Sequence, residues 1–146
     1  EYPAEYKRQS VTRKCEVDRL EKELSLILAR NSEYKVGIIT FYSAQAKLLN
    51  DMVHAKFPSD IYRICVGTVD AFQGKEFDIV LLSVVRSNEE TEMKKRVGFL
   101  NNDNRLCVAF SRAKRLLVAV GDSKTVAFDG EKEYIKALHE MYKKCQ

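Results

Sequence analysis

Four stretches of the chain repeat apolar residues at intervals of three and four, which is the spacing of an amphipathic helix. They cover residues 13–31, 43–57, 102–114 and 131–144. The second should end before Pro58, because proline disfavours helical geometry in the residue that precedes it. The side chains expected to face the core are Val17, Leu20, Leu24, Ile27, Leu28, Leu48, Leu49, Met52, Val53, Leu106, Ala109, Phe110, Ala113, Tyr134, Ile135, Leu138 and Tyr142.

Four short apolar runs alternate with these helices, and each is typical of a strand buried on both faces of a parallel sheet. They are residues 36–41, 61–69, 78–85 and 116–120. The alternation predicts a three-layer α/β domain with a mainly parallel sheet, and the polar stretch 87–95 is expected to be a surface loop. In such sheets the functional surface lies beyond the carboxyl ends of the strands. Those ends carry Thr40-Phe41-Tyr42, Thr68-Val69-Asp70, Val85-Arg86-Ser87 and Gly121-Asp122.

Size and composition are those of one globular domain, residues 1–146, without linkers or repeats. Hydrophobic residues make up 45% of the chain and charged residues 32%, which excludes a disordered tail. No apolar run approaches the roughly 20 residues that cross a bilayer, so we expect no membrane partner. The chain does not begin with Met, and we expect it to be a piece of a longer protein.

The four cysteines are widely separated and the chain has only two histidines, which disfavours a zinc site. A domain of this size with its own core does not need disulfides either. Scattered thiols within apolar runs are typical of an intracellular protein. We therefore expect no metal ligands in this chain.

The net charge of +4 is concentrated in residues 86–115, where eight basic residues face four acidic ones. Such a stretch either contacts nucleic acid or is a solvated loop, and the charge alone does not distinguish the two. The basic residues are Arg86, Lys94, Lys95, Arg96, Arg105, Arg112, Lys114 and Arg115.

Common catalytic and nucleotide-binding motifs are absent. The chain has no Gly-x-x-x-x-Gly-Lys-Ser/Thr loop, no Gly-x-Gly-x-x-Gly and no Gly-x-Ser-x-Gly. It therefore cannot cradle a triphosphate or a dinucleotide in the usual ways. As a self-contained enzyme the sequence looks incomplete.

The segment 66–78 gathers hydroxyl, amide and carboxylate groups at a strand end. Thr68, Asp70, Gln73 and Glu76 lie around Gly74, a residue that tolerates a tight turn. Such a loop can bond a sugar-phosphate backbone on one side and orient a nucleotide phosphate or water on the other. The alternative is an ordinary polar turn between two strands.

The segment 104–114 carries Arg105 and Arg112, seven residues apart and hence on one face of a helix. Arginine supplies a permanent charge and a rigid fork of donors, as needed to stabilise a γ-phosphate during phosphoryl transfer. The alternative is an exposed basic helix face.

These segments resemble motifs of the superfamily 1 helicases of the up-frameshift and senataxin type. Residues 68–76 (TVDAFQGKE) resemble motif V, and residues 98–101 with 105–113 (GFLN, RLCVAFSRA) resemble motif VI and its lead-in. Residues 36–42 (VGIITFY) with Gln45 resemble motif IV. The segment 10–17, ending near Glu16, faintly resembles the family's preceding motif. The motifs stand in the family's order over most of the chain.

The resemblance implies a RecA-like domain of the P-loop NTPase type that lacks its own Walker A loop: the second, C-terminal motor domain of an ATP-dependent DNA or RNA helicase. In the family, ATP and Mg²⁺ are bound mainly by an N-terminal RecA-like domain, which would be a partner within the same longer chain. Single-stranded nucleic acid would be the other partner, and the protein would be an intracellular monomer. The isolated piece would be inactive.

Carried over by position, the resemblance makes Arg112 the arginine finger, with Glu76 and Gly74 near the γ-phosphate. It assigns Gln45, Gln73 and Arg105 to the nucleotide side and Tyr42 to the nucleic-acid track. Thr68 and Asp70 would lie towards that track or serve the coupling of motifs V and VI. The arginine of the early motif would fall at Arg13 or Lys14, and the sequence does not choose between them. Phe41 and Phe72 are further candidates for stacking on bases, with core packing as the alternative.

Some positions depart from the family pattern, namely Phe41, Asn104, Cys107 and Ser111. None of them is the finger arginine, so ATP chemistry is still expected. Two other interpretations stay open: a non-catalytic interaction module, and the motor part of a helicase–nuclease.

Overall fold

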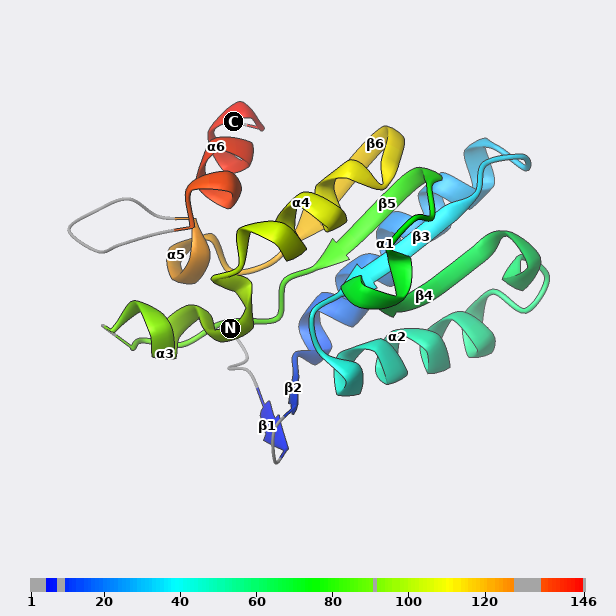
Figure 1. The fold of residues 1–146 in the computed structure, drawn as a ribbon. Coiled ribbons are helices and arrows are strands. Elements are labelled where there is room, and N and C mark those ends of the chain that lie inside the picture. Colours follow the sequence, from blue (N-terminus) through cyan, green and yellow to red (C-terminus); the bar gives the residue numbers. More distant parts are fainter. Residues whose placement is uncertain (1–4, 8–9, 91, 128–134, 146) are drawn as a thin grey trace.

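The computed structural model describes residues 5–7, 10–90, 92–127 and 135–145. Its centre is a parallel four-stranded sheet in the order β4-β3-β5-β6, shown in Figure 1. The strands are β3 (Val36–Thr40), β4 (Ile64–Thr68), β5 (Phe77–Ser83) and β6 (Ala113–Val120). This confirms the predicted α/β class and the parallel sheet.

The sheet is accompanied by six helices, three 3₁₀ turns and a small hairpin within the described residues. The longer helices are α1 (Lys14–Arg30), α2 (Ser43–Lys56), α4 (Asp103–Ser111) and α6 (Lys136–Lys144). The short ones are α3 (Met93–Val97), α5 (Ser123–Val126), η1 (Ile61–Arg63), η2 (Val69–Phe72) and η3 (Gly98–Leu100). β1 (Glu5–Lys7) and β2 (Ser10–Thr12) form the antiparallel hairpin.

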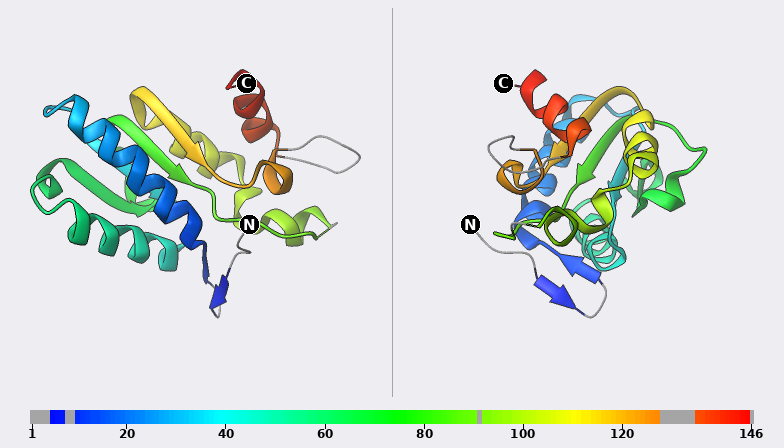
Figure 2. Two further views of the ribbon diagram at one scale, coloured as in Figure 1. Left: turned by 180° about the vertical axis from the view of Figure 1, so that it is seen from behind. Right: turned by 60° about the vertical axis from the view of Figure 1, so that its left-hand side comes forward.

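Helices cover both faces of the sheet, so the fold has three layers (Figures 1 and 2). On one face, α1 and α2 bury apolar stripes against the inner side chains of β3 and β5. On the other face, η2 and α4 pack against Ile39 and Leu82 through Phe72, Leu106 and Ala109. All five of these side chains are buried. Successive side chains of a strand point to opposite faces of the sheet, so the sheet separates two hydrophobic clusters.

Several predicted boundaries were wrong. The helix predicted over 102–114 ends at Ser111, and β6 already begins at Ala113. Ala113 pairs with Phe77, and the N–H of Phe77 donates to the carbonyl of Arg112. The helix ends before these residues because they bond to β5. The strand predicted from Ile61 begins at Ile64 instead, because a 3₁₀ turn closed by the Arg63–Asp60 ion pair precedes it.

Two predicted core positions are exposed, and one predicted element is only partly described. Leu48 and Tyr142 lie at the surface, although each follows the helical spacing of its neighbours. Leu138 and Ile135 are buried as predicted. Residues 131–134 of the predicted last helix, Tyr134 included, lie outside the described residues.

The strand register aligns the ends of the strands into two edges. At the carboxyl edge, Thr40 pairs with Thr68 and Ser83, and Ser83 pairs with Val120. At the amino edge, Phe77 of β5 pairs with Ala113 of β6. α4 leads from the carboxyl edge back to the amino edge, because it ends directly before β6 (Figure 1).

Candidate functional site

Arg112 joins the end of α4 to the loop before β5. Its guanidinium donates to the carbonyl oxygen of Lys75 at 3.1 Å and to that of Val108 at 3.1 Å. A third bond runs from Nη2 to the hydroxyl of Ser111 at 2.8 Å. Lys75 lies between Gly74 and Glu76, so the structure brings Arg112 to the loop that carries both of these predicted site residues.

The charges at this edge leave the arginine without an acidic neighbour. Among the described residues, no carboxylate lies within ion-pair distance of Arg112; the nearby Glu76 pairs with Lys114 at 3.4 Å, and both of those side chains are exposed. Gly74 has a φ of 78°, and a Cβ there would meet nothing within 4 Å. The positive charge of Arg112 is thus held in place by neutral acceptors beside an open loop, and it is available to an anion.

This group lies away from the edge of the sheet where we expected function. We expected function beyond the carboxyl ends of the strands, whereas Arg112 and Glu76 directly precede β6 and β5 and lie at the amino edge. The cause is the direction of α4, which carries the chain from one edge to the other. Arg105 and Arg112 are therefore separated by about 10 Å along the helix axis and face different surroundings.

A cavity of about 150 Å³ lies between η2 and α4, and it unites three other predicted residues. Asp70, Gln73 and Arg105 line it together with Asn104. Arg105 pairs with Asp70 at 3.5 Å, which links motifs V and VI across two elements. Asp70, assigned by resemblance to the nucleic-acid track or to the coupling of motifs V and VI, thus contacts a residue of motif VI.

Two of the three aromatic candidates, Tyr42 and Phe72, are buried and not available for stacking, whereas Phe41 is partly exposed. Tyr42 is only 3% exposed, and its hydroxyl accepts a 2.7 Å hydrogen bond from Nε of Arg86. Phe72 is fully buried in the core, as the alternative interpretation held. Thr68 is partly exposed at the end of β4, so it keeps the predicted position.

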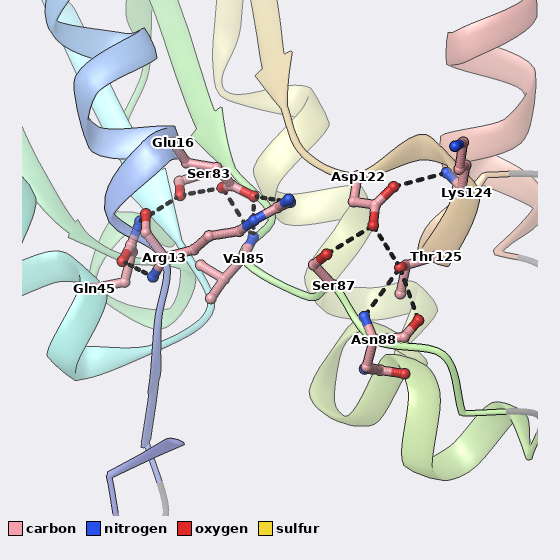
Figure 3. Close-up of polar contacts among 10 residues, drawn as sticks. All are labelled: Arg13, Glu16, Gln45, Ser83, Val85, Ser87, Asn88, Asp122, Lys124 and Thr125. Carbon is pink, nitrogen blue, oxygen red and sulfur yellow. Dashed lines mark hydrogen bonds and ion pairs between the residues drawn. The ribbon is translucent and has the colours of Figure 1, made fainter. Parts of the chain in front are cut away.

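Gln45 lies in the interior rather than on the nucleotide side. Its Oε1 accepts from the backbone N–H of Arg13 at 2.9 Å, and its Nε2 donates to the carbonyl of Arg13 and to the hydroxyl of Ser83. Ser83 in turn donates to the carboxylate of Glu16 at 2.7 Å. Figure 3 shows this buried chain of contacts, which ties the starts of α1 and α2 to the end of β5. The side chain of Gln45 is fully buried there, so it cannot contact a nucleotide directly.

Glu16 is the charged centre of this buried cluster. It accepts from the N–H of Val85 at 3.1 and 3.0 Å and forms an ion pair with Arg13 at 3.4 Å. Burial raises the pKa of Glu16 above its ordinary value, although the bonds from Ser83 and Val85 and the charge of Arg13 oppose the rise. Arg13 is buried with it, whereas Lys14 is exposed and pairs with Asp18.

A second polar cluster fixes the chain just after Val85 (Figure 3). The carboxylate of Asp122 accepts from the hydroxyls of Ser87 at 2.7 Å and Thr125 at 2.9 Å. Burial alone would raise the pKa of Asp122, but these bonds and the charge of Arg13 lower it overall. Asn88 bonds to Thr125 through its N–H, so the loop is tied to α5.

The stretch Lys94–Arg96 is only partly the surface loop that we expected. It lies in α3, and Arg96 is buried with its Nε donating to the carbonyl of Thr125 at 3.1 Å. Lys94 and Lys95 are exposed. Arg96 therefore belongs to the frame of the loop and is not available to phosphate.

Residues 1–124 match the family AAA_12, described as an AAA domain. The chain belongs to this family. It is 43% identical over 93 residues, 64% of the chain, to "Helicase required for RNAi-mediated heterochromatin assembly 1" of Schizosaccharomyces pombe. It is 41% identical over 108 residues (74%) to "DNA polymerase alpha-associated DNA helicase A" of Saccharomyces cerevisiae, and 36% over 122 residues (81%) to "Regulator of nonsense transcripts 1" of Caenorhabditis elegans. The aligned parts span 9%, 15% and 11% of these relatives.

As an AAA_12 domain similar to these proteins, the chain is of the superfamily 1 helicase type, as its motifs predicted. The helicase family uses ATP with Mg²⁺ and binds nucleic acid. In the described ranges, no three His, Cys, Asp or Glu side chains come together in a way that could hold a metal ion. Nor is any helix in the described part of the chain long and apolar enough to cross a membrane.

Two residues of this AAA_12 domain, Phe99 and Arg86, were not among the candidate site residues that we selected from the sequence. Phe99 is 52% exposed, and the guanidinium of Arg105 lies 5.3 Å from its ring centroid. Phe99 was visible only as part of the motif VI lead-in, and Arg86 only as one charge of a basic stretch. The arrangement that brings them together depends on η3, which is too short to leave a periodic pattern.

Proposed function

We propose that this chain is the second RecA-like motor domain of an ATP-dependent helicase, and that it supplies one half of an ATP site to a preceding RecA-like domain of the same longer protein. The observation that carries the proposal is the pairing of Arg112 with the Gly74–Glu76 loop, with no carboxylate partner for the arginine among the described residues. An arginine anchored by neutral carbonyls keeps its charge for an incoming γ-phosphate.

The chemistry expected of this half-site is electrostatic. Phosphoryl transfer needs little covalent help from the protein beyond positioning and charge stabilisation. Arg112 would stabilise the charge that develops on the transferred phosphoryl group, and Glu76 and the backbone at Gly74 would border it. The other domain would supply the phosphate-binding loop and the carboxylates for Mg²⁺.

Nucleic acid would lie along the carboxyl edge, at the opposite end of α4 from Arg112. Thr68 and the basic residues Arg86 and Lys94 are the groups that the fold offers there. Contacts of this kind are mostly to phosphate and carry no base sequence. One relative is named as a DNA helicase and another as a helicase required for RNAi-mediated heterochromatin assembly. We propose single-stranded nucleic acid as the substrate without choosing between DNA and RNA.

The deciding experiment replaces Arg112 in the full-length protein. Arg112→Ala should lower ATP turnover by about 10³-fold or more, which is the range known for arginine fingers, and nucleotide affinity should fall far less. Arg112→Lys should fail as well, because an ammonium group cannot reproduce the fork.

Arg115→Ala is the matched control, since Arg115 is an exposed arginine three residues further on that pairs with Asp78. It should leave turnover near that of the wild type. Turnover close to wild type in either Arg112 variant would contradict the proposed finger role and make Arg112 an exposed charge on the helix.

A further inference from the structure

A hollow of about 460 Å³ opens at the carboxyl edge, between the end of β5 and the start of α4. We term it the Phe99 pocket. Its lining includes Arg86, Lys94, Gly98, Phe99, Asn102 and Arg105. Three basic side chains, a half-exposed aromatic ring and an amide thus converge on one space, away from the Arg112 edge.

Phe99 is held in place from two sides. Arg105 lies over its ring at 5.3 Å, and the ring of Tyr42 meets it edge-on with centroids 6.2 Å apart. These contacts hold the half-exposed ring of Phe99 in one position. An immobilised, half-exposed phenylalanine in a basic hollow offers a planar group a stacking surface at little cost in side-chain entropy.

Arg86 is fixed just as firmly. Its Nε donates to the hydroxyl of Tyr42, its guanidinium lies 5.6 Å from the Tyr42 ring centroid, and Nη1 reaches the carbonyl of Lys95 at 3.5 Å. Gly98 makes room for it, because a Cβ at that position would lie 2.0 Å from Nη2 of Arg86. Contacts with η3 and with the buried Tyr42 thus fix the position of the guanidinium.

The backbone before Arg86 is strained. Val85 has a φ of 74°, rare for a β-branched residue, and the N–H of Arg86 donates to the carbonyl of Val84 across it. Such strain persists only where the surroundings enforce it, and here the Glu16 carboxylate binds the N–H of Val85 while Asp122 holds Ser87. The two buried clusters in Figure 3 therefore clamp the chain on both sides of Arg86.

The pocket also carries uncompensated charge. Arg105 has Asp70 as a partner, and Glu92 pairs with Lys95, but in the described part of the chain no carboxylate pairs with Lys94. An anion beside Lys94 would therefore meet positive charge without displacing an acidic side chain from that lysine.

We infer that the Phe99 pocket binds one nucleotide of a single-stranded nucleic acid, with its base stacked on Phe99 and its phosphate beside Arg86 and Lys94. This inference rests on the strand binding proposed above and gives it a place and a geometry. A nucleotide carries a planar base and a phosphate, joined by a sugar. The pocket offers an aromatic ring for the base and basic groups for the phosphate.

A single tryptophan reports on this pocket, because the chain contains none. Phe99→Trp should give a fluorescence signal that a short oligothymidylate quenches to saturation. An oligomer of the same length with abasic sites should bind without this quenching, since it lacks the stacking base. Tyr62→Trp is the matched control: Tyr62 is 79% exposed in η1, which precedes β4 at the opposite edge of the sheet, and its signal should not change.

Charge and stacking are then separated by two further variants. Lys94→Ala should flatten the log–log dependence of oligothymidylate affinity on salt by about 0.7, the slope for one phosphate contact, while Lys22→Ala on α1 should leave it unchanged. Phe99→Leu should weaken oligothymidylate binding about five-fold or more and leave the binding of the abasic oligomer unaffected.

Each outcome bears on the inference. If anisotropy shows salt-dependent binding of oligothymidylate but the indole at position 99 is not quenched, the strand passes elsewhere; the inference then fails while the proposed strand binding stands. If no oligomer binds, both are overturned, and only the Arg112 experiment still bears on the motor proposal. Quenching by free ATP as strong as by oligothymidylate would assign the pocket to mononucleotides and overturn the inference.

Discussion

Gly98 and Gly74 both have a positive φ, but only Gly98 has a neighbour where a side chain would begin. A Cβ at Gly98 would lie 2.0 Å from Nη2 of Arg86, whereas nothing lies within 4 Å of a Cβ at Gly74. Gly74→Ala should therefore cost about 1 kcal/mol of unfolding free energy through backbone strain alone. Gly98→Ala should cost about 1–3 kcal/mol more, because the tightly held Arg86 has to move.

Urea unfolding of the two variants and the wild type measures the difference. Equal losses for Gly74→Ala and Gly98→Ala would contradict the close packing of Arg86 against η3. Both substitutions carry backbone strain, since φ is 78° at Gly74 and 53° at Gly98.

At the scale of single residues, the sequence did not indicate how deeply the candidate residues are buried. Gln45 follows a strand end closely, as an exposed site residue would, but Ser83 lies 38 residues further along the chain and encloses it. Tyr42 is covered in the same way by Arg86, 44 residues away. The covering groups are distant in sequence, and spacing within one element carries no information about them.

The starts of α1 and α2 and the end of β5 depend on a shared carboxylate, Glu16. Burial raises its pKa above the ordinary value of 4.5. A carboxyl with a raised native pKa contributes stability that is fully present below its unfolded pKa and is lost as pH rises through the native pKa. The ion pair with Arg13 and the bonds from Ser83 and Val85 limit the loss without reversing its sign.

Wild type and Glu16→Gln should therefore differ in a pH-dependent way. The unfolding free energy of the wild type, relative to the variant, should fall as pH rises from below 4.5 through the raised pKa and then level off. Asp122 titrates in both proteins, so its opposite contribution cancels in the difference. Urea unfolding across this pH range is the measurement.

Glu23→Gln on the same helix provides the control. Glu23 pairs with Arg19 at the surface, so this variant should change stability by no more than about 0.5 kcal/mol. A difference between wild type and Glu16→Gln that is constant with pH would refute the assignment of Glu16 as a buried, destabilised carboxylate.

Elements were predicted well where periodicity is long, and poorly where they are short. α1 and α2 extend over 17 and 14 residues, enough for several turns of the apolar repeat, and their predicted positions were correct. α3 and η3 have five and three residues, too few for any period to show. The change from helix α4 to strand β6 at residue 112 was not predicted, because it depends on pairing with β5 and not on local propensity.

At the scale of the whole molecule, the candidate residues form two groups, one at each end of α4. The amino edge presents Arg112 and the loop before β5, and the carboxyl edge presents the Phe99 pocket and Thr68. Arg105, which lines the Phe99 pocket, pairs with Asp70 and so joins α4 to η2. In the proposed motor, this helix would link nucleotide state at one end to strand contacts at the other.

A half-site of this kind binds nucleotide weakly by itself. At the amino edge, ATP would meet Arg112, the open loop at Gly74 and the exposed ion pair of Glu76 with Lys114, and the carboxylate of Glu76 would repel the phosphates. Calorimetry of the 146-residue chain with Mg²⁺-ATP should therefore show no binding tighter than about millimolar, a free energy near −4 kcal/mol, and no hydrolysis. Arg112→Ala should leave this weak binding nearly unchanged, because the finger acts on charge that develops only in the transition state. A low-micromolar dissociation constant or measurable turnover from the isolated chain would mean that the ATP site is complete within it, and the division of the site between two domains would be wrong.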